Sequence, residues 1–455
     1  MKWRERTKGA VAVAGLGLML TASLAYAGGF FTNGVPPAGG TQYPSTIPLT
    51  GNETLPADTN LSSGLNPQSE AISTRQMANF AAANGITTQG NFLIGGDATT
   101  NLFQRATTGS SVTTTATYGG PDRWFYWSGA STAMTVSRDS TAADLPTGYQ
   151  YDFKMQRTAS QTGVVQMCMA QVVSSQNSYA LAGQTVELDF HAATGANFSP
   201  AAPYNMTAYI VSGTGADEGS ADLAKGLNGG GGGSVGWTGQ ANATAAVIAL
   251  GGVSKLGRYA AVASIPAAAT EVGVALCYTP VGTAGTTDAL FFSGVQLVKN
   301  PSNVGAVNVA TGYSCDNSFN TQIQCVPFQR RAASLEASLQ YAYYYQLSEV
   351  TGPSVVANCR AHSVTVAECF VPTPVPMRAA ATVTYASPGF ATETTTAGGT
   401  LGACNTLATA ATSSPVGSTQ GILVGCTATT VPAAGSADLL WNNGGSGAIK
   451  FSAEL

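Results

Sequence analysis

Residues 271–300, EVGVALCYTPVGTAGTTDALFFSGVQLVKN, decide the fold of this chain. Large and small side chains alternate over residues 271–279, which is the period-2 pattern of a half-buried strand. Turn-forming residues follow at 280–287, and a second strand is expected at 289–299, with Gly294 at a bulge. Two such strands predict a β-sandwich whose other strands precede them in the chain.

Strand patterns also dominate residues 91–270. About a dozen short segments alternate in polarity, turns separate them, and no helical pattern lies between them, which is typical of a sandwich or jelly roll. We therefore predict an all-β chain with short helices only. It consists of a jelly-roll β-sandwich over residues 91–300 and a second, smaller β domain over 334–455.

The segments that flank the predicted jelly roll have weaker patterns. Residues 28–90 are rich in Gly, Pro, Thr and Asn, and we expect an extended attachment segment with one short helix that starts at a capping box at Ser73. Residues 301–333 are expected to be a linker bracketed by disulfides. In the second β domain, a short helix is predicted at 334–340 and a last strand at 448–455.

Residues 1–27 have the layout of a secretory signal peptide. Four basic residues precede an apolar run, and Ala25-Tyr26-Ala27 provides a small-x-small cleavage site. An uncleaved anchor is the alternative, although the run is short for a membrane span. No later segment is apolar enough to span, so we expect a secreted protein at a cell surface or on an appendage.

The charge of the chain argues against nucleic-acid binding. Only 9% of the residues are charged, and the formal net charge is −4, so there is no basic surface that would attract phosphates.

The eight cysteines of an exported chain predict disulfides. Zinc is the competing interpretation, but the sequence has no CxxC motif and only two histidines. Proximity suggests three pairs and leaves two cysteines on the small-residue faces of their strands, where they could form a cross-strand bridge. The suggested pairs are Cys315 with Cys325, Cys359 with Cys369, Cys404 with Cys426, and Cys168 with Cys277.

The sharpest polar pattern lies on the strand expected at residues 184–191. Glu187, Asp189 and His191 alternate with apolar residues and therefore share one face. A solvated sheet face is one interpretation, and sugar contacts are a second. A third is a divalent-metal or acid–base cluster, since paired carboxylates can divide the roles of general acid and base.

Aromatic residues are the other candidates for sugar binding. On a strand, Trp124 and Tyr126 point to one side, and Phe125 and Trp127 point to the other. One pair is expected in the core, and the other either joins it there or stacks on a sugar ring. Trp237 follows a run of five glycines and is predicted to be exposed, because such a loop has little to bury it.

A structural calcium ion is a further hypothesis. Asp97 and Asp288 lie near the first and last strands of the predicted jelly roll. Calcium takes six to eight oxygen ligands, so two separate carboxylates do not establish a site.

Several stretches resemble phage tail-fibre and appendage proteins that have a jelly-roll domain similar to carbohydrate-binding modules. The resemblance implies an oligomeric, non-catalytic adhesion protein that binds a cell-surface glycan, on a virion or on a bacterial surface. The stretches are NFLIGGDATTNLFQR (91–105), PDRWFYWSG (121–129), QTVELDFHAATGANFS (184–199), YTPVGTAG (278–285), FFSGVQL (291–297), VPFQRR (326–331), YYY (343–345), PVPMRAAATV (374–383), FSAEL (451–455) and the lead-in at 47–78.

Two alternatives to glycan binding remain open at this point. The jelly roll would also suit a purely structural subunit that packs against copies of itself and binds no sugar. A glycan-cleaving enzyme would use Glu187 and Asp189 as its paired carboxylates.

Overall fold

The structure of the chain is a computed structural model. It divides the chain into two compact units, residues 1–78 and 79–455, which we describe separately. The described residues are 54–58, 69–73 and 90–455, the last with gaps at 106–109, 112–113, 130–133, 142–144, 146–147, 200–202, 228–235, 253–256, 300–312, 315–325, 327, 349–353, 364, 386–389, 395–401, 410–420, 429–436 and 443–447.

The first unit contributes one described feature. Strands β1 (Thr54–Asp58) and β2 (Ser69–Ser73) pair in antiparallel register. The predicted signal peptide and the helix expected after Ser73 lie outside the described residues.

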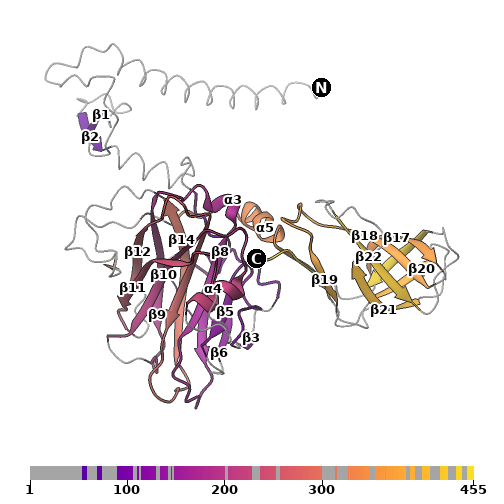
Figure 1. The fold of residues 1–455 in the computed structure, drawn as a ribbon, viewed down its shortest axis with the longest axis horizontal. Coiled ribbons are helices and arrows are strands. Elements are labelled where there is room, and N and C mark those ends of the chain that lie inside the picture. Colours follow the sequence, from indigo (N-terminus) through magenta and orange to yellow (C-terminus); the bar gives the residue numbers. More distant parts are fainter. Residues whose placement is uncertain are drawn as a thin grey trace, which may run out of the picture. The chain divides into compact units, whose positions relative to one another are not determined.

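The second unit begins with a β-sandwich of two antiparallel sheets, so the predicted all-β sandwich is confirmed (Figure 1). Successive strands change sheets at β3–β4, β5–β6, β7–β8, β8–β9, β9–β10, β11–β12, β12–β13 and β13–β14, as in a jelly roll. The six-stranded sheet has the order β11 (Ala241–Ala249), β10 (Asn205–Gly213), β13 (Glu271–Tyr278), β8 (Met167–Val173), β5 (Phe125–Ser128) and β4 (Thr117–Tyr118). The seven-stranded sheet has the order β15 (Tyr313–Ser314), β12 (Gly257–Ser264), β9 (Thr185–Thr194), β14 (Ala289–Lys299), β7 (Asp152–Arg157), β6 (Met134–Asp139) and β3 (Ser110–Ser111).

The predicted half-buried strand is buried on both faces. In β13, Val272, Val274, Leu276 and Tyr278 point into the core between the sheets, as the alternation predicts. The small residues on the opposite face are also buried, as members of a second apolar cluster on the outer side of the six-stranded sheet. The local sequence pattern predicts a half-buried strand, because the residues that cover its outer face are distant in the sequence.

Helix α4 (Ser220–Gly226) and Trp237 provide much of this cover. The Trp237 ring lies against Gly273 of β13, where an added Cβ would come within 2.8 Å of the ring, and its Nε1 donates to the Gly219 carbonyl over 3.1 Å. Trp237 is therefore only 3% exposed, and the prediction of an exposed sugar-binding tryptophan is wrong.

Both aromatic pairs of residues 124–127 are core residues. Trp124 and Tyr126 belong to the core between the sheets, whereas Phe125 and Trp127 stack on each other in the outer cluster, with ring centroids 5.8 Å apart. All four side chains have 0% exposure, so Trp124, Tyr126 and Trp127 present no surface to a sugar. The prediction that Trp124, Tyr126 and Trp127 contact a ligand is therefore wrong. The alternative, in which both aromatic pairs lie in the core, is confirmed.

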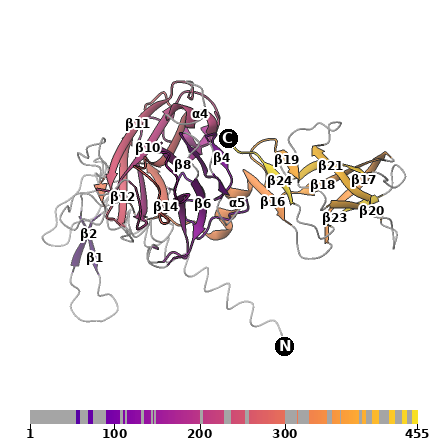
Figure 2. The same ribbon diagram turned by 90° about the horizontal axis from the view of Figure 1, so that it is seen from below.

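The rest of the second unit is also β structure. Helix α5 (Ala333–Tyr341) confirms the helix expected at 334–340, and β24 forms within the predicted last strand. Strands β16 (Tyr344–Ser348), β24 (Ala448–Ser452) and β19 (Thr382–Tyr385) make a three-stranded sheet. A closed barrel, which Figure 2 shows from below, consists of β17 (Ser354–Ser363), β18 (Val366–Pro372), β22 (Gly421–Ala428), β21 (Gly402–Thr409), β20 (Phe390–Thr394) and β23 (Ala437–Asn442).

Two of the predicted disulfides are confirmed. Cys168 and Cys277 face each other on the paired strands β8 and β13, with Cα atoms 4.1 Å apart. Cys359 and Cys369 bridge β17 and β18. Cys426 is also disulfide-bonded, whereas Cys315, Cys325 and the side chain of Cys404 lie outside the description.

The predicted bulge at Gly294 is present, because the pairing of β14 with β9 shifts register between Ser293 and Gln296. Gly294 has a φ of +61°, and an added Cβ would lie 2.5 Å from the Tyr149 hydroxyl and 3.1 Å from His191 Nδ1. The bulge therefore requires glycine for its backbone conformation and for its space.

We expect Gly294→Ala to lower the free energy of unfolding by about 2–3 kcal/mol, measured by urea denaturation. Gly282→Ala is the matched control, since Gly282 also has a positive φ, +71°, but has open space around it. An equal loss in both variants would show that the contacts with Tyr149 and His191 do not matter.

Candidate functional site

The polar strand identified in the sequence is β9, at the middle of the seven-stranded sheet. Its neighbours place Ala260 of β12 and Gln296 of β14 opposite Asp189, and Arg258 opposite His191. We call Glu187, Asp189, Arg258 and Gln296 the polar layer. These four side chains come from three adjacent strands and share the outer face of the sheet.

Val326 and Gln329 lie over the polar layer. The Val326 N–H donates to Glu187 Oε1 over 3.1 Å, and Gln296 Nε2 donates to the Val326 carbonyl over 2.7 Å. The Gln329 N–H donates to Gln296 Oε1 over 2.9 Å. Glu187 and Asp189 are thereby fully buried at 0% exposure. Two interpretations of this strand are therefore wrong: a solvated sheet face, and a direct sugar contact by Glu187 and Asp189. The chain itself covers the face on which these two carboxylates lie.

Asp189 lies at the centre of the polar layer. Its Oδ1 accepts from the Arg258 guanidinium over 3.0 Å, and its Oδ2 accepts from Gln296 Nε2 over 2.7 Å. Burial raises the pKa of the Asp189 carboxyl to about 6, although Arg258 and the two hydrogen bonds act in the opposite direction. The hydrogen bonds of the layer hold Val326 and Gln329 on the sheet.

His191 lies at the edge of this cover and is partly exposed. Its ring centroid is 5.6 Å from that of Tyr149, which in turn packs against Phe328. Arg330 lies over the Tyr149 ring and forms an ion pair with Asp97 over 2.9 Å. The predicted trio of Glu187, Asp189 and His191 thus shares one face, but its two carboxylates are fully buried beneath Val326 and Gln329.

The two carboxylates considered for calcium each have an arginine partner. Asp97 pairs with Arg330, and Asp288 pairs with Arg157 over 2.7 Å with both side chains fully buried. Arg157 also donates to the carbonyls of three loop residues, Gln161, Gly163 and Gly282. Among the residues that the structure describes, no group of three or more His, Cys, Asp or Glu side chains is placed to hold a metal ion.

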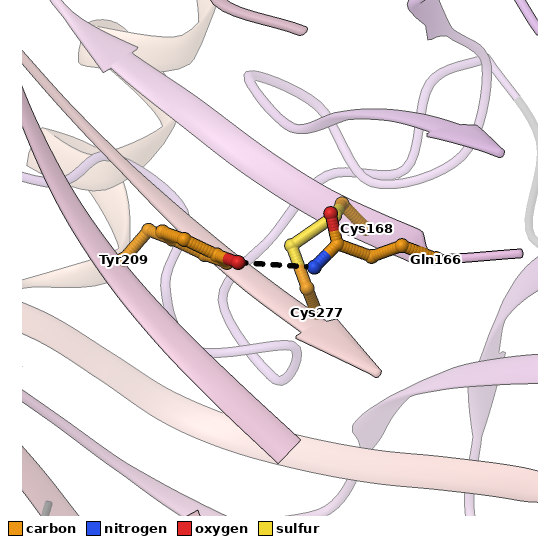
Figure 3. The surroundings of a disulfide bond; sticks show 4 residues. All are labelled: Gln166, Cys168, Tyr209 and Cys277. Atoms are coloured by element: carbon orange, nitrogen blue, oxygen red, sulfur yellow. Dashed lines mark hydrogen bonds between the residues drawn. A yellow bond between two sulfur atoms is a disulfide. The ribbon is translucent and has the colours of Figure 1, made fainter. Parts of the chain in front are cut away.

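Part of the outer side of the six-stranded sheet, beside the apolar cluster that covers it, stays partly exposed. Tyr209 of β10 and Gln166, which precedes β8, are both partly exposed. The Gln166 side-chain amide donates to the Tyr209 hydroxyl over 3.1 Å (Figure 3). Strand β13 lies between β10 and β8, so this hydrogen bond crosses β13 beside the Cys168–Cys277 disulfide. We call Tyr209, Gln166 and the adjacent Thr207 the tyrosine platform.

The tyrosine platform has a rigid base. Four residues on adjacent strands lie opposite one another and form one row across the sheet. In order, they are Thr207, Cys277, Cys168 and Trp127. The disulfide and the buried Trp127 are fully covered, whereas Tyr209 and Gln166 above them retain exposure. An aromatic ring with a hydroxyl and an amide beside it can stack on an apolar sugar face and bond to ring hydroxyls.

Sequence analysis missed the tyrosine platform, although a signal was present. In the stretch NMTAYIVS, Thr207 and Tyr209 alternate with Met206, Ala208 and Ile210, so a polar aromatic residue lies on the face opposite the core. Gln166 could not be found in this way, because its proximity to Tyr209 depends on the strand order β10-β13-β8.

We expect the free energy of unfolding to depend on pH through Asp189. The folded chain keeps this proton up to about pH 6, whereas the unfolded chain releases it near its ordinary pKa of 3.8. Stability should therefore fall as the pH rises through this window, by up to about 1.4 kcal/mol per pH unit. Asp189→Asn should remove that part of the slope in urea denaturation between pH 4 and pH 7.

Asp222→Asn on α4 is the matched control, because this carboxylate is 40% exposed and pairs with Lys225 at the surface. The control should keep the slope of the unsubstituted chain. If Asp189→Asn also kept it, Asp189 would not carry its proton into this pH range.

The comparisons with known proteins give only distant matches. No protein-family model matches the chain, and no curated protein matches it. A solved structure of the enzymatically active domain of bacteriophage CBA120 tailspike protein 4 matches 46% of this chain with a TM-score of 0.26 and 12% identity. This chain covers only 21% of that tailspike chain.

Two further solved structures contain carbohydrate-binding modules. A CBM4 structure matches 39% of this chain and 88% of its own, with a TM-score of 0.23 and 15% identity. The CBM22-1 and GH10 modules of Clostridium thermocellum xylanase 10B, in complex with xylohexaose, match 41% of this chain and 28% of their own, with a TM-score of 0.24 and 8% identity. Likenesses at these TM-scores carry no argument about function, so the resemblance to phage appendage proteins stays a prediction.

Proposed function

We propose that this chain is an extracellular, non-catalytic adhesion protein that binds a cell-surface glycan through the tyrosine platform. The observation that carries the proposal is the partly exposed Tyr209 ring, hydrogen-bonded to the Gln166 amide on an outer sheet face. Sugar-binding sites combine an aromatic surface with a few fixed polar groups, and these residues provide both.

The burial of the acidic pair supports binding rather than cleavage. A glycosidase needs two carboxylates that reach the glycosidic bond from either side. Glu187 and Asp189 have 0% exposure, and their oxygens are engaged by Val326, Arg258 and Gln296. The enzyme alternative therefore loses the carboxylates on which it was based.

The disulfides support an extracellular setting. Cys168–Cys277 and Cys359–Cys369 are fully formed within strand pairs, and such bridges persist in oxidising compartments. Each helix in the described part of the chain is too short or too polar to cross a lipid bilayer.

The proposal predicts that Tyr209→Ala weakens glycan binding. The test is an array of bacterial surface polysaccharides probed with the oxidised chain that lacks residues 1–27. The loss of stacking and of the positioned hydroxyl should weaken the best ligand at least about tenfold. Gln166→Ala should weaken it less, because the ring remains.

Tyr179→Ala is the matched control, since Tyr179 is a surface tyrosine with 61% exposure outside the platform. This variant should bind as the unsubstituted chain does. Binding that survives Tyr209→Ala would exclude the platform, and release of reducing ends from a bound glycan would favour the enzyme alternative.

A further inference from the structure

We infer that Glu271 is a proton-dependent latch for the cover that α4 and Trp237 form on the six-stranded sheet. Glu271 is the first residue of β13, and its side chain is fully buried at 0% exposure. The latch is closed while the carboxyl group carries a proton, and it is weakened once the group is ionised. Ionising a buried carboxyl group beside other acidic groups costs free energy, and the contacts of Glu271 transmit that cost to the cover.

Glu271 holds the loop that precedes α4. Its Oε1 accepts from the Glu218 backbone N–H over 2.5 Å and from the Ser175 hydroxyl over 3.4 Å. The same hydroxyl accepts from the Asp217 N–H over 2.6 Å, and the Ser175 N–H donates to Asp217 Oδ1 over 3.0 Å. Residues 217–218 are therefore fixed at the end of β13 by one buried carboxyl group and one serine.

Glu218 connects this loop to the cover. Its side-chain oxygens accept from the backbone N–H and from the hydroxyl of Thr238, over 2.7 and 2.9 Å. Thr238 follows Trp237, whose Nε1 donates to the Gly219 carbonyl. Helix α4 begins directly after Gly219. A displacement of residues 217–219 would therefore displace both parts of the cover.

The groups that face Glu271 are acidic or neutral. Glu218 and Asp217 are the titratable groups that interact with it. The paired strand β10 places Gly213 opposite it, and α3 (Ser175–Ser178), which packs on β13, has no titratable side chain. Burial is the main cause that raises the pKa of Glu271, to about 7, and the side chain of Glu218 and the charge of Asp217 act in the same direction. The hydrogen bond from the Glu218 N–H acts in the opposite direction.

The cations around the cover are paired with other carboxylates. Lys225 pairs with Asp222 on α4, and Arg378 pairs with Asp217 over 3.3 Å. In the residues that the structure describes, no lysine or arginine forms an ion pair with Glu271 or Glu218. An ionised Glu271 would therefore lie beside a second carboxylate in a buried site without a compensating cation.

The direction of the pH effect follows from these contacts. With the latch open, Glu271 releases its proton near its ordinary pKa of 4.5, whereas with the latch closed it keeps the proton up to about pH 7. The free energy that closes the cover is therefore largest below pH 4.5 and falls as the pH rises to 7. The cover should be held more tightly in acid than at pH 8.

The latch also affects the proposed glycan site, a step that rests on the proposed function. Tyr209 packs against the same apolar cluster that contains Trp237 and Leu223 of α4. A looser cover weakens the packing of the cluster that supports the Tyr209 ring, so glycan affinity should be lower at pH 8 than at pH 5.

The test is hydrogen exchange of the oxidised chain without residues 1–27 at pH 5 and pH 8, compared as protection factors. We expect the protection of the amides of residues 222–227 and 238–240 to fall at least about tenfold between the two pH values, because each unit of pKa difference is a factor of ten. The amides of β8 should not follow, since its pairing with β13 and β5 is not part of the cover.

Glu271→Gln should show equal protection at pH 5 and pH 8, because glutamine keeps the Oε1 acceptor and cannot ionise. Glu218→Gln removes the facing charge and should reduce the loss of protection at pH 8. Asp222→Asn is the matched control on α4 itself, and it should lose protection as the unsubstituted chain does.

Equal changes in β8 and in the cover would overturn the inference. So would a Glu271→Gln chain that still loses protection at pH 8. If that variant does not fold, Glu218→Gln decides the question, because a loss as large as that of the unsubstituted chain would contradict the latch.

Hydrogen exchange requires no glycan, so its outcome is separate from that of the proposed function. A pH-dependent cover in a chain that binds no glycan would leave the latch standing and remove the proposed function. Glycan binding by a chain whose cover is independent of pH would do the reverse.

Discussion

The structure depends on covering both faces of its sheets. In a two-layer sandwich, each sheet buries only the face that points toward the other sheet. Here the central strands β13 and β9 are buried on their outer faces as well. Helix α4 and Trp237 cover the first, and Val326 and Gln329 lie over the second. The chain therefore behaves as a sandwich with additional layers over part of each sheet.

The two covers use different chemistry. The cover on the six-stranded sheet is apolar, and it is shaped around small residues such as Gly273, which leave room for the Trp237 ring. The cover on the seven-stranded sheet is polar, with Asp189, Arg258 and Gln296 satisfied beneath Val326 and Gln329. Buried charges need partners, and this arrangement provides each of them with one.

A third contact fixes the end of the described chain to the sandwich. Glu454 forms ion pairs with Arg105 and Arg123, and the backbone carbonyl of Leu455 accepts from the Tyr118 hydroxyl. The two guanidinium groups also stack on Tyr344 and Tyr343. Strand β24 and the segment after α5 are thereby held on the same edge of the sandwich. On the outer face of the six-stranded sheet, the tyrosine platform stays partly exposed.

The sequence by itself determined the class of fold, because alternation and turn spacing are local properties. It placed the strands around Cys277 and Gly294, the helix at 334–340 and two disulfides whose cysteines lie on paired strands. Only the tertiary structure decided which polar and aromatic residues are accessible. Trp237, Glu187 and Asp189 look exposed locally, but each is buried with the help of residues that lie outside its own strand or loop, such as Gly219 for Trp237 and Val326 for Glu187. Tyr209 and Gln166 meet because β13, formed from residues more than 60 positions further along, inserts between their strands.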